Sequence, residues 1–114
     1  MEQVDKHKIA ESWIAMHLAG SGTQVYEDNF WAFMKLDDLV YKDPFQALEI
    51  IKAIILTNSS EVILTNLGAG PLENLMCYND SAVIDDIEAL AKTNLCFKKA
   101  MARFIGYKIF REVL

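Results

Sequence analysis

Hydrophobic residues recur every three or four positions along most of the chain, which is the spacing of amphipathic helices. A first helix is predicted over Asp5 to Ala19, with Trp13 and Met16 on its apolar side. The sequence GSGT at positions 20–23 then interrupts the pattern. Trp13 and His17 are one helical turn apart, so their rings can contact each other, and His17 is interpreted as a structural residue.

The second predicted helix runs from about Asp28 to Tyr41. At about 100° per residue, its apolar face collects five side chains: Phe30, Phe33, Leu36, Val40 and Tyr41. Asp37 falls within this face, where an unpaired carboxylate is costly to desolvate. Two interpretations stay open. Asp37 is either a structural acceptor for the helix N-terminus around Gly70 to Glu73, or a functional charge.

The third helix is predicted over Pro44 to Leu56. Asp43 can cap its free amides, and Pro44 has a φ that suits the first helical turn. Polar side chains occupy only three of its positions, Gln46, Glu49 and Lys52. The third helix is therefore expected to be the central and most buried one.

Two short helices are predicted on either side of the sequence GAGP at positions 68–71. One runs from about Ser60, as a capping residue, to Leu67, and the other from Pro71 to Cys77 or Tyr78. β-branched residues in the first of them would also suit a strand, but no second strand is predicted to pair with it.

The GAGP sequence is expected to form a rigid corner between these two helices. Gly68 and Gly70 are expected to adopt the positive φ that ends a helix, and Pro71 to begin the next one. Glu73 is placed so that its carboxylate can reach back to the Gly70 amide.

A sixth helix is predicted over about Ala82 to Lys92, with Asp85 and Asp86 on its polar face and Glu88 at the edge of its apolar face. Thr93 and Asn94 cap the seventh helix. Its core stripe is Phe97, Ala100, Met101 and Phe104, and Gly106 interrupts it. The tail 107–114 carries five apolar residues that need cover.

The predicted fold is all-α. It has about seven helices in a single domain, residues 1–114. An N-terminal helix precedes three consecutive hairpins, formed by helices two and three, four and five, and six and seven. This layout resembles a truncated HEAT-like solenoid, in which a concave face binds partners.

Composition and charge narrow the classes of partner. With 16 acidic and 11 basic residues, the net charge is −5, which disfavours nucleic acid and favours a basic partner. The N-terminal sequence MEQVDKHK has no apolar run typical of a signal peptide, and no run is long enough to span a membrane. Cys77 and Cys96 form no CxxC pair and are expected to stay reduced in the cytoplasm.

Three segments carry a resemblance to a known family: FWAFMKLDDLVYKDPFQALEII, ILTNLGAGPLENLM and IDDIEALAKTNLCFKKAM. They resemble a bacterial family of small helical proteins, a domain of unknown function with an LDDLV-x-x-DP stretch and an A-G-P-L-E-x-L-L motif. The resemblance covers roughly residues 28–105, and Met76 stands where the motif prefers Leu. It implies a helical fold and no chemistry. Proteins of this size and composition are also similar to immunity proteins of bacterial toxin systems.

The favoured function is therefore that of a protein-binding module. Its most specific form is a cytoplasmic immunity or antitoxin-like protein that neutralises a basic toxin or effector. Its candidate contacts are carboxylates: Asp37, Asp38, Asp85, Asp86 and Glu88. No catalytic residue, metal ligand or cofactor is predicted. One alternative is a small hydrolase-like enzyme with Asp37, Glu73 and Glu88 as a carboxylate cluster. Another is a homo-oligomeric module, a homodimer through the C-terminal tail.

Overall fold

The computed structural model describes residues 5–79 and 81–102, with the side chains of residues 81 and 82 excepted. In this part of the chain the secondary structure is entirely helical, which confirms the predicted all-α class. The helices are α1 (Lys6–Ala19), α2 (Gln24–Lys42), α3 (Pro44–Thr57), α4 (Glu61–Ala69), α5 (Pro71–Tyr78), α6 (Ser81–Thr93) and α7 (Leu95–Met101).

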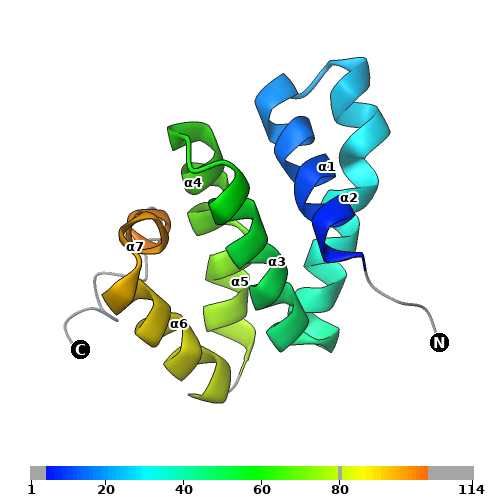
Figure 1. Ribbon diagram of the computed structural model, residues 1–114. Coiled ribbons are helices and arrows are strands. Elements are labelled where there is room, and N and C mark those ends of the chain that lie inside the picture. The colour runs from blue at the N-terminus through cyan, green and yellow to red at the C-terminus, as the bar shows by residue number, and fades with distance from the viewer. Residues whose placement is uncertain (1–4, 80, 103–114) are drawn as a thin grey trace.

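The helices pack as a flat layer of 42 × 35 × 21 Å (Figure 1). Helices α1 and α2 form a hairpin at one edge, and α6 and α7 lie at the other edge. Helix α3 lies between them and contacts each of the other six helices. Its central position confirms the prediction made from its scarcity of polar residues.

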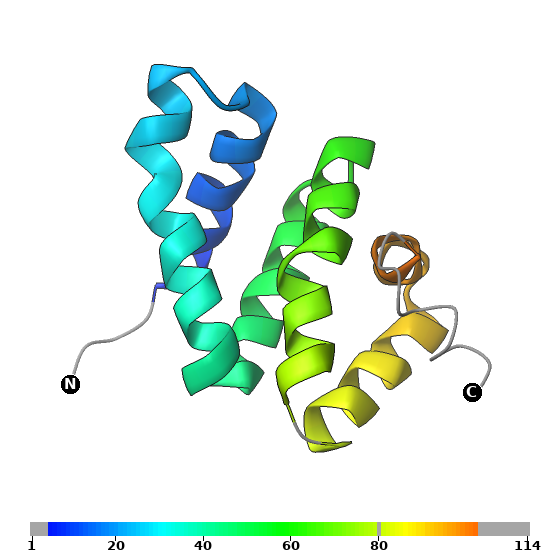
Figure 2. The ribbon, with the colours of Figure 1, turned by 180° about the vertical axis from the view of Figure 1, so that it is seen from behind.

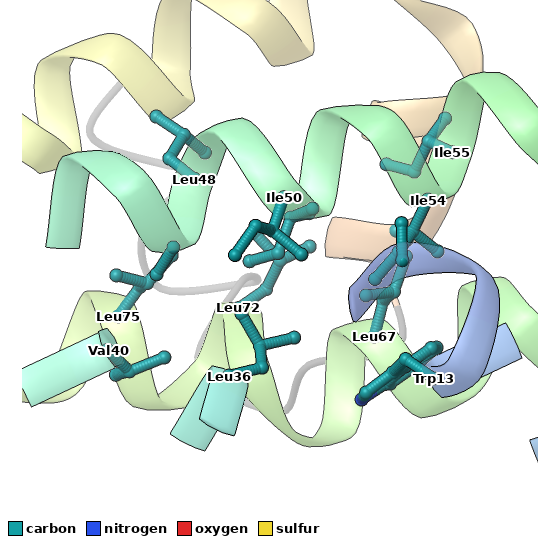
Figure 3. Close-up of a cluster of buried hydrophobic side chains, with 14 of the residues drawn as sticks. Trp13, Leu36, Val40, Leu48, Ile50, Ile54, Ile55, Leu67, Leu72 and Leu75 are labelled. Carbon is teal, nitrogen blue, oxygen red and sulfur yellow. The ribbon is translucent and has the colours of Figure 1, made fainter. Parts of the chain in front are cut away.

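Leucine and isoleucine side chains from α2, α3, α4 and α5 meet in the core around α3 (Figure 3). Six residues of α3 are buried, namely Ala47, Leu48, Ile50, Ile51, Ile54 and Ile55. The described residues include no buried charged side chain. Burial of apolar area, at about 25 cal/mol per Å², is the main term that stabilises such a core.

Helix α2 begins a full turn earlier than predicted. Thr23 lies at its N-cap, where the side-chain oxygen accepts a hydrogen bond from the Tyr26 amide at 3.1 Å. This cap satisfies one of the free amides of the first turn, so the helix includes Gln24 to Glu27 as well. Gly20 and Gly22 form the preceding loop with φ of 82° and 89°, which glycine adopts most easily.

The buried face of α2 is also displaced from the predicted one. Four residues are buried: Ala32, Leu36, Leu39 and Val40. Phe33 and Tyr41, predicted to lie in the apolar core face, are exposed, and Phe30 is only partly buried. Compared with the predicted orientation, α2 is rotated about its axis. Its small and aliphatic side chains face α1 and α3, and its aromatic side chains lie at the edges of this buried face.

The predicted corner at residues 68–71 is wrong in its backbone geometry. Gly68 lies inside α4 and is buried, and Gly70 has a φ of −128°, so neither adopts a positive φ. Gly70 nevertheless lies close to the backbone of α4. A Cβ atom at this position would lie 3.0 Å from the backbone oxygen of Asn66. No hydrogen bond joins Glu73 to the Gly70 amide within the described residues, so the predicted capping contact is absent there.

The predicted pairing of the fourth and fifth helices is wrong as well. Figure 2 shows α4 and α5 following one another along a single bent rod that lies beside α3. Pro71 starts a new helical segment without reversing the chain, because its ring removes one amide but keeps a helical φ. The hairpin in this part of the molecule is therefore formed by α3 and the α4–α5 rod. Helix α7 crosses α6 steeply and is seen end-on in Figure 1.

The predicted caps behave differently from one another. Asp43 caps α3, since its carboxylate accepts from the Gln46 amide at 3.3 Å and from the Gln46 side chain at 2.9 Å. Asn94 caps α7 through a 3.0 Å hydrogen bond from the Phe97 amide. Ser60 occupies the N-cap position of α4, but its side chain makes no capping hydrogen bond.

Candidate functional site

Exposed apolar side chains gather on the outer side of α2. Met34 is 61% exposed, Tyr41 51%, Trp31 40% and Phe33 37%. Together with three charged neighbours they line a shallow hollow of about 770 Å³, which we call the α2 surface: Trp31, Phe33, Met34, Lys35, Asp37, Asp38 and Tyr41. Clusters of exposed apolar residues on small proteins are typical of binding sites.

Aromatic rings contact one another in two groups at this surface. The Phe30 and Phe33 rings stack with their centroids 5.2 Å apart, and Tyr26 approaches Phe30 at 5.8 Å. Tyr41 contacts Tyr78 of α5 at 5.5 Å. Helical spacing of three and four residues brings Tyr26, Phe30 and Phe33 together, whereas the contact of Tyr41 with Tyr78 joins α2 to α5. These contacts restrain the rings before any partner binds.

Trp31 lies toward the other edge of α2, near α1. The ammonium group of Lys8 lies 5.7 Å from the centroid of the Trp31 ring, which is within cation–π distance. The indole ring of Trp31 therefore already accommodates a cationic side chain on one side.

The two carboxylates of the α2 surface have different surroundings. Asp38 forms an ion pair with Lys42 at 3.1 Å, and both side chains are well exposed. Asp37 is half-buried one turn from Phe33 and Tyr41. Desolvation raises the pKa of the Tyr41 phenol, and the nearby carboxylate of Asp37 and the ring of Tyr78 raise it further.

Asp37 lies near the junction of α4 and α5, the region to which one of its two interpretations assigned it. It lines a second, small cavity together with Gly70, Pro71 and Asn74. The predicted hydrogen bond from Asp37 to the amides of Gly70 to Glu73 is absent from the described contacts. Asp37 thus lies near the helix N-terminus named in the structural interpretation, and whether its role is structural or functional stays a prediction.

The remaining candidate contacts lie elsewhere. Asp85, Asp86 and Glu88 belong to α6, on the opposite side of α3 from α2 (Figure 1). Asp85 and Asp86 are exposed and Glu88 is half-buried. The five predicted carboxylates thus form two separate acidic regions instead of one face.

Asp86 lies at a second hollow, of about 330 Å³, between α3 and α6. Lys52 and Glu49 line the same hollow and form an ion pair with each other at 3.1 Å. This hollow and the α2 surface are each lined by two carboxylates and one lysine, so they differ in their exposed aromatic residues and not in charge.

The carboxylate cluster of the alternative enzyme does not form as a metal site. Asp37, Glu73 and Glu88 come from α2, α5 and α6. Within the described residues, no group of three His, Cys, Asp or Glu side chains is close enough to hold a metal ion. Cys77 is exposed and Cys96 half-buried, and both are free thiols.

The sequence did not single out Trp31, Phe33, Met34 and Tyr41 as surface residues. One signal was available. Helix α2 carries apolar side chains over more of its circumference than one buried face can cover, with five of them aromatic: Tyr26, Phe30, Trp31, Phe33 and Tyr41. Such an excess predicts that some aromatic residues are exposed, although it does not say which.

No helix within the described ranges has the length and apolar character needed to cross a bilayer. The tail 107–114, predicted to mediate self-association, lies outside the described residues.

Comparison with known proteins identifies a family for most of the chain. No curated protein and no solved structure matches the chain. Residues 19–105 match a family of unknown function, DUF6869, and include α2 to α7 and thus the whole α2 surface. The match begins at residue 19, whereas the resemblance seen in the sequence began at about residue 28. The chain therefore belongs to DUF6869.

Proposed function

We propose that this protein is a protein-binding module and that its α2 surface contacts a basic segment of another protein. The observation that carries the proposal is the exposure of Trp31, Phe33, Met34 and Tyr41 beside two carboxylates on one helix. Aromatic residues and methionine are enriched in protein interfaces, where a few of them supply most of the binding energy.

The charge of the surface supports a basic partner. The two carboxylates Asp37 and Asp38 outnumber the one basic residue that lines the surface, Lys35, and the whole chain carries a net charge of −5. Acidic groups of this kind accelerate the encounter with a positively charged surface. The ion pair between Asp38 and Lys42 is exposed, so exchanging Lys42 for a basic residue of the partner costs little free energy.

The specific form that we propose is a cytoplasmic immunity or antitoxin-like protein that neutralises a basic toxin or effector by direct binding. The small size, acidic charge and helical fold support this form, by similarity with immunity proteins. Asp85, Asp86 and Glu88 would then form a separate contact of the same partner or of another one, because α6 lies away from the α2 surface.

Affinity capture from the source cell tests the binding proposal. Tagged wild-type protein is compared with Met34→Lys, which places a positive charge in the α2 surface. The matched control is Leu56→Lys, which introduces the same charge at an exposed apolar residue of α3, 89% exposed and outside this surface. A basic protein should be retained by the wild type and by Leu56→Lys.

Purified components then give the affinity. Met34→Lys should weaken binding at least about fivefold, because loss of an interface anchor costs more than about 1 kcal/mol. A captured partner that is acidic, or that binds Met34→Lys as tightly as wild type, would contradict the proposal.

Growth experiments test the immunity form separately. Expression of the captured partner alone should arrest growth, and co-expression of the wild-type protein should restore it, whereas Met34→Lys should not. The neighbouring reading frame offers a further check. A toxin-like gene directly upstream supports immunity, and an operon of metabolic enzymes argues against it.

A further inference from the structure

A small cavity lies where α1 and α2 meet the junction of α4 and α5. Its volume is about 50 Å³, and six residues line it: Trp13, Phe33, Asp37, Gly70, Pro71 and Asn74. Phe33 and Asp37 also line the larger hollow of the α2 surface. The cavity therefore lies directly behind the candidate binding site.

Trp13 brings an unpartnered donor to this cavity. Its side chain is only 1% exposed, and its indole N–H has no hydrogen-bond acceptor within the described residues. A buried donor of this kind is destabilising unless something accepts its hydrogen bond.

The other polar groups around the cavity are complementary to this donor. The Asp37 carboxylate can only accept hydrogen bonds when ionised, and the Asn74 amide can both donate and accept. Gly70 is the N-cap of α5 and has no side chain to cap it, so first-turn amides of α5 also lack a partner within the helix. The residues that line the cavity thus include a buried donor on Trp13, an acceptor on Asp37 and an amide on Asn74 that can do both.

We propose that this cavity is a built hydration site. At least one ordered water molecule accepts the hydrogen bond of the Trp13 indole N–H and donates to the Asp37 carboxylate. A water molecule needs about 10 to 15 Å³ of such volume, so the cavity has room for water but not for a larger organic ligand.

The surrounding charges also select water over an ion. An anion would meet the carboxylate of Asp37. A cation would meet the indole N–H and the positive end of α5. A neutral molecule that both donates and accepts is the ligand that satisfies both groups at once.

The hydration site links the core to the surface. Through the bridging water, Trp13 of α1 holds the Asp37 carboxylate in one position on α2, which makes Trp13 a positioning residue for the α2 surface. This last step rests on the proposed function, whereas the hydration site itself does not.

Water-to-protein magnetisation transfer in a ¹⁵N-labelled full-length chain tests the site. Trp31→Phe removes the other indole signal and assigns the remaining one to Trp13. We expect a cross-peak between the Trp13 indole proton and long-lived water. Loss of that cross-peak is expected in Asp37→Leu, which fills the cavity and removes the acceptor, and its retention in the control Asp38→Leu.

Absence of the cross-peak in the folded Trp31→Phe protein would overturn the proposal, whatever the affinity of the α2 surface for a partner. A crystal structure gives a second test that does not need a variant. Ordered density for water between Trp13 and Asp37 supports the site, and a direct hydrogen bond between the indole N–H and the carboxylate refutes it.

Discussion

His17 shows how burial gives a single side chain a measurable effect. Its ring contacts Trp13 with centroids 4.1 Å apart and planes tilted by 52°, so the contact expected from their spacing in the sequence is present. The Nε2 atom of His17 is buried without a hydrogen-bond partner within the described residues, and this burial lowers the pKa of the imidazole below 6.5.

This lowered pKa predicts a pH dependence of stability. The unfolded chain binds the His17 proton more tightly than the folded chain, so the free energy of unfolding rises with pH in this range. The contribution of His17 is fully present above pH 6.5 and is lost as pH falls toward the lower folded pKa. His17→Phe, which keeps an aromatic ring against Trp13, should remove this part of the slope in urea denaturation between roughly pH 7.5 and 5.

His7 provides the control for this experiment. It is exposed on the same helix, so His7→Gln should preserve the wild-type dependence on pH. If the His17→Phe protein loses stability on acidification as steeply as wild type, His17 is not the group responsible.

Asp37 gives a second prediction at this scale. Its carboxylate lies beside the uncapped N-terminus of α5, where a negative charge is favourable. Asp37→Asn should therefore lower the free energy of unfolding by about 0.3 to 1 kcal/mol in chemical denaturation. A midpoint at or above that of wild type, together with lost partner binding, would instead identify Asp37 as a purely functional charge.

At the scale of elements, the helix caps act individually. Asp43 ends α2, with its own amide bonded to the Leu39 carbonyl at 2.8 Å, and starts α3 through two hydrogen bonds to Gln46. Ser60 holds the equivalent position before α4 but makes no side-chain cap. The two residues occupy the same kind of position with different local contacts.

This difference predicts unequal costs for the same truncation. Asp43→Ala should lower the free energy of unfolding by about 1 kcal/mol, the usual effect of removing a capping side chain. Ser60→Ala should leave it unchanged within about 0.5 kcal/mol, as for an exposed site without such a contact. Thermal or urea unfolding of the two variants in parallel measures both values. Equal losses would show that the hydrogen bonds of the Asp43 side chain do not stabilise the fold.

At the scale of the whole molecule, the flat layer leaves its outer helices covered on one side only. Helix α3 contacts all the others, whereas α2 presents exposed aromatic residues at one edge. The C-terminal residues 107–114 add Tyr107, Ile109, Phe110, Val113 and Leu114 to the apolar side chains that need cover.

The tail gives a prediction about self-association. Removing residues 107–114 should change the sedimentation mass from that of a dimer to that of a monomer, because these apolar residues are expected to join two copies. Sedimentation equilibrium of the full chain and the truncated chain at matched concentration measures this. A monomer in both cases would exclude the homodimer.

Local features were predictable from the sequence because they depend on residues within one or two helical turns. The helix over Pro44–Thr57, the Asp43 and Asn94 caps and the apolar stripe of α6 each follow from spacing and side-chain chemistry in a short window. The buried position of α3 was equally clear, since so few of its residues are polar.

Only the tertiary structure decided which of several apolar sides became core. Helix α2 offers Phe33 and Tyr41 as well as Ala32 and Leu39, and packing against α1 and α3 buries the latter pair. The same packing places Asp37 on α2 and Asp85 on α6 at opposite edges of the layer. It also places α4 and α5 end to end along one bent rod. These outcomes depend on contacts between residues far apart in the chain, and periodicity within one helix carries no information about them.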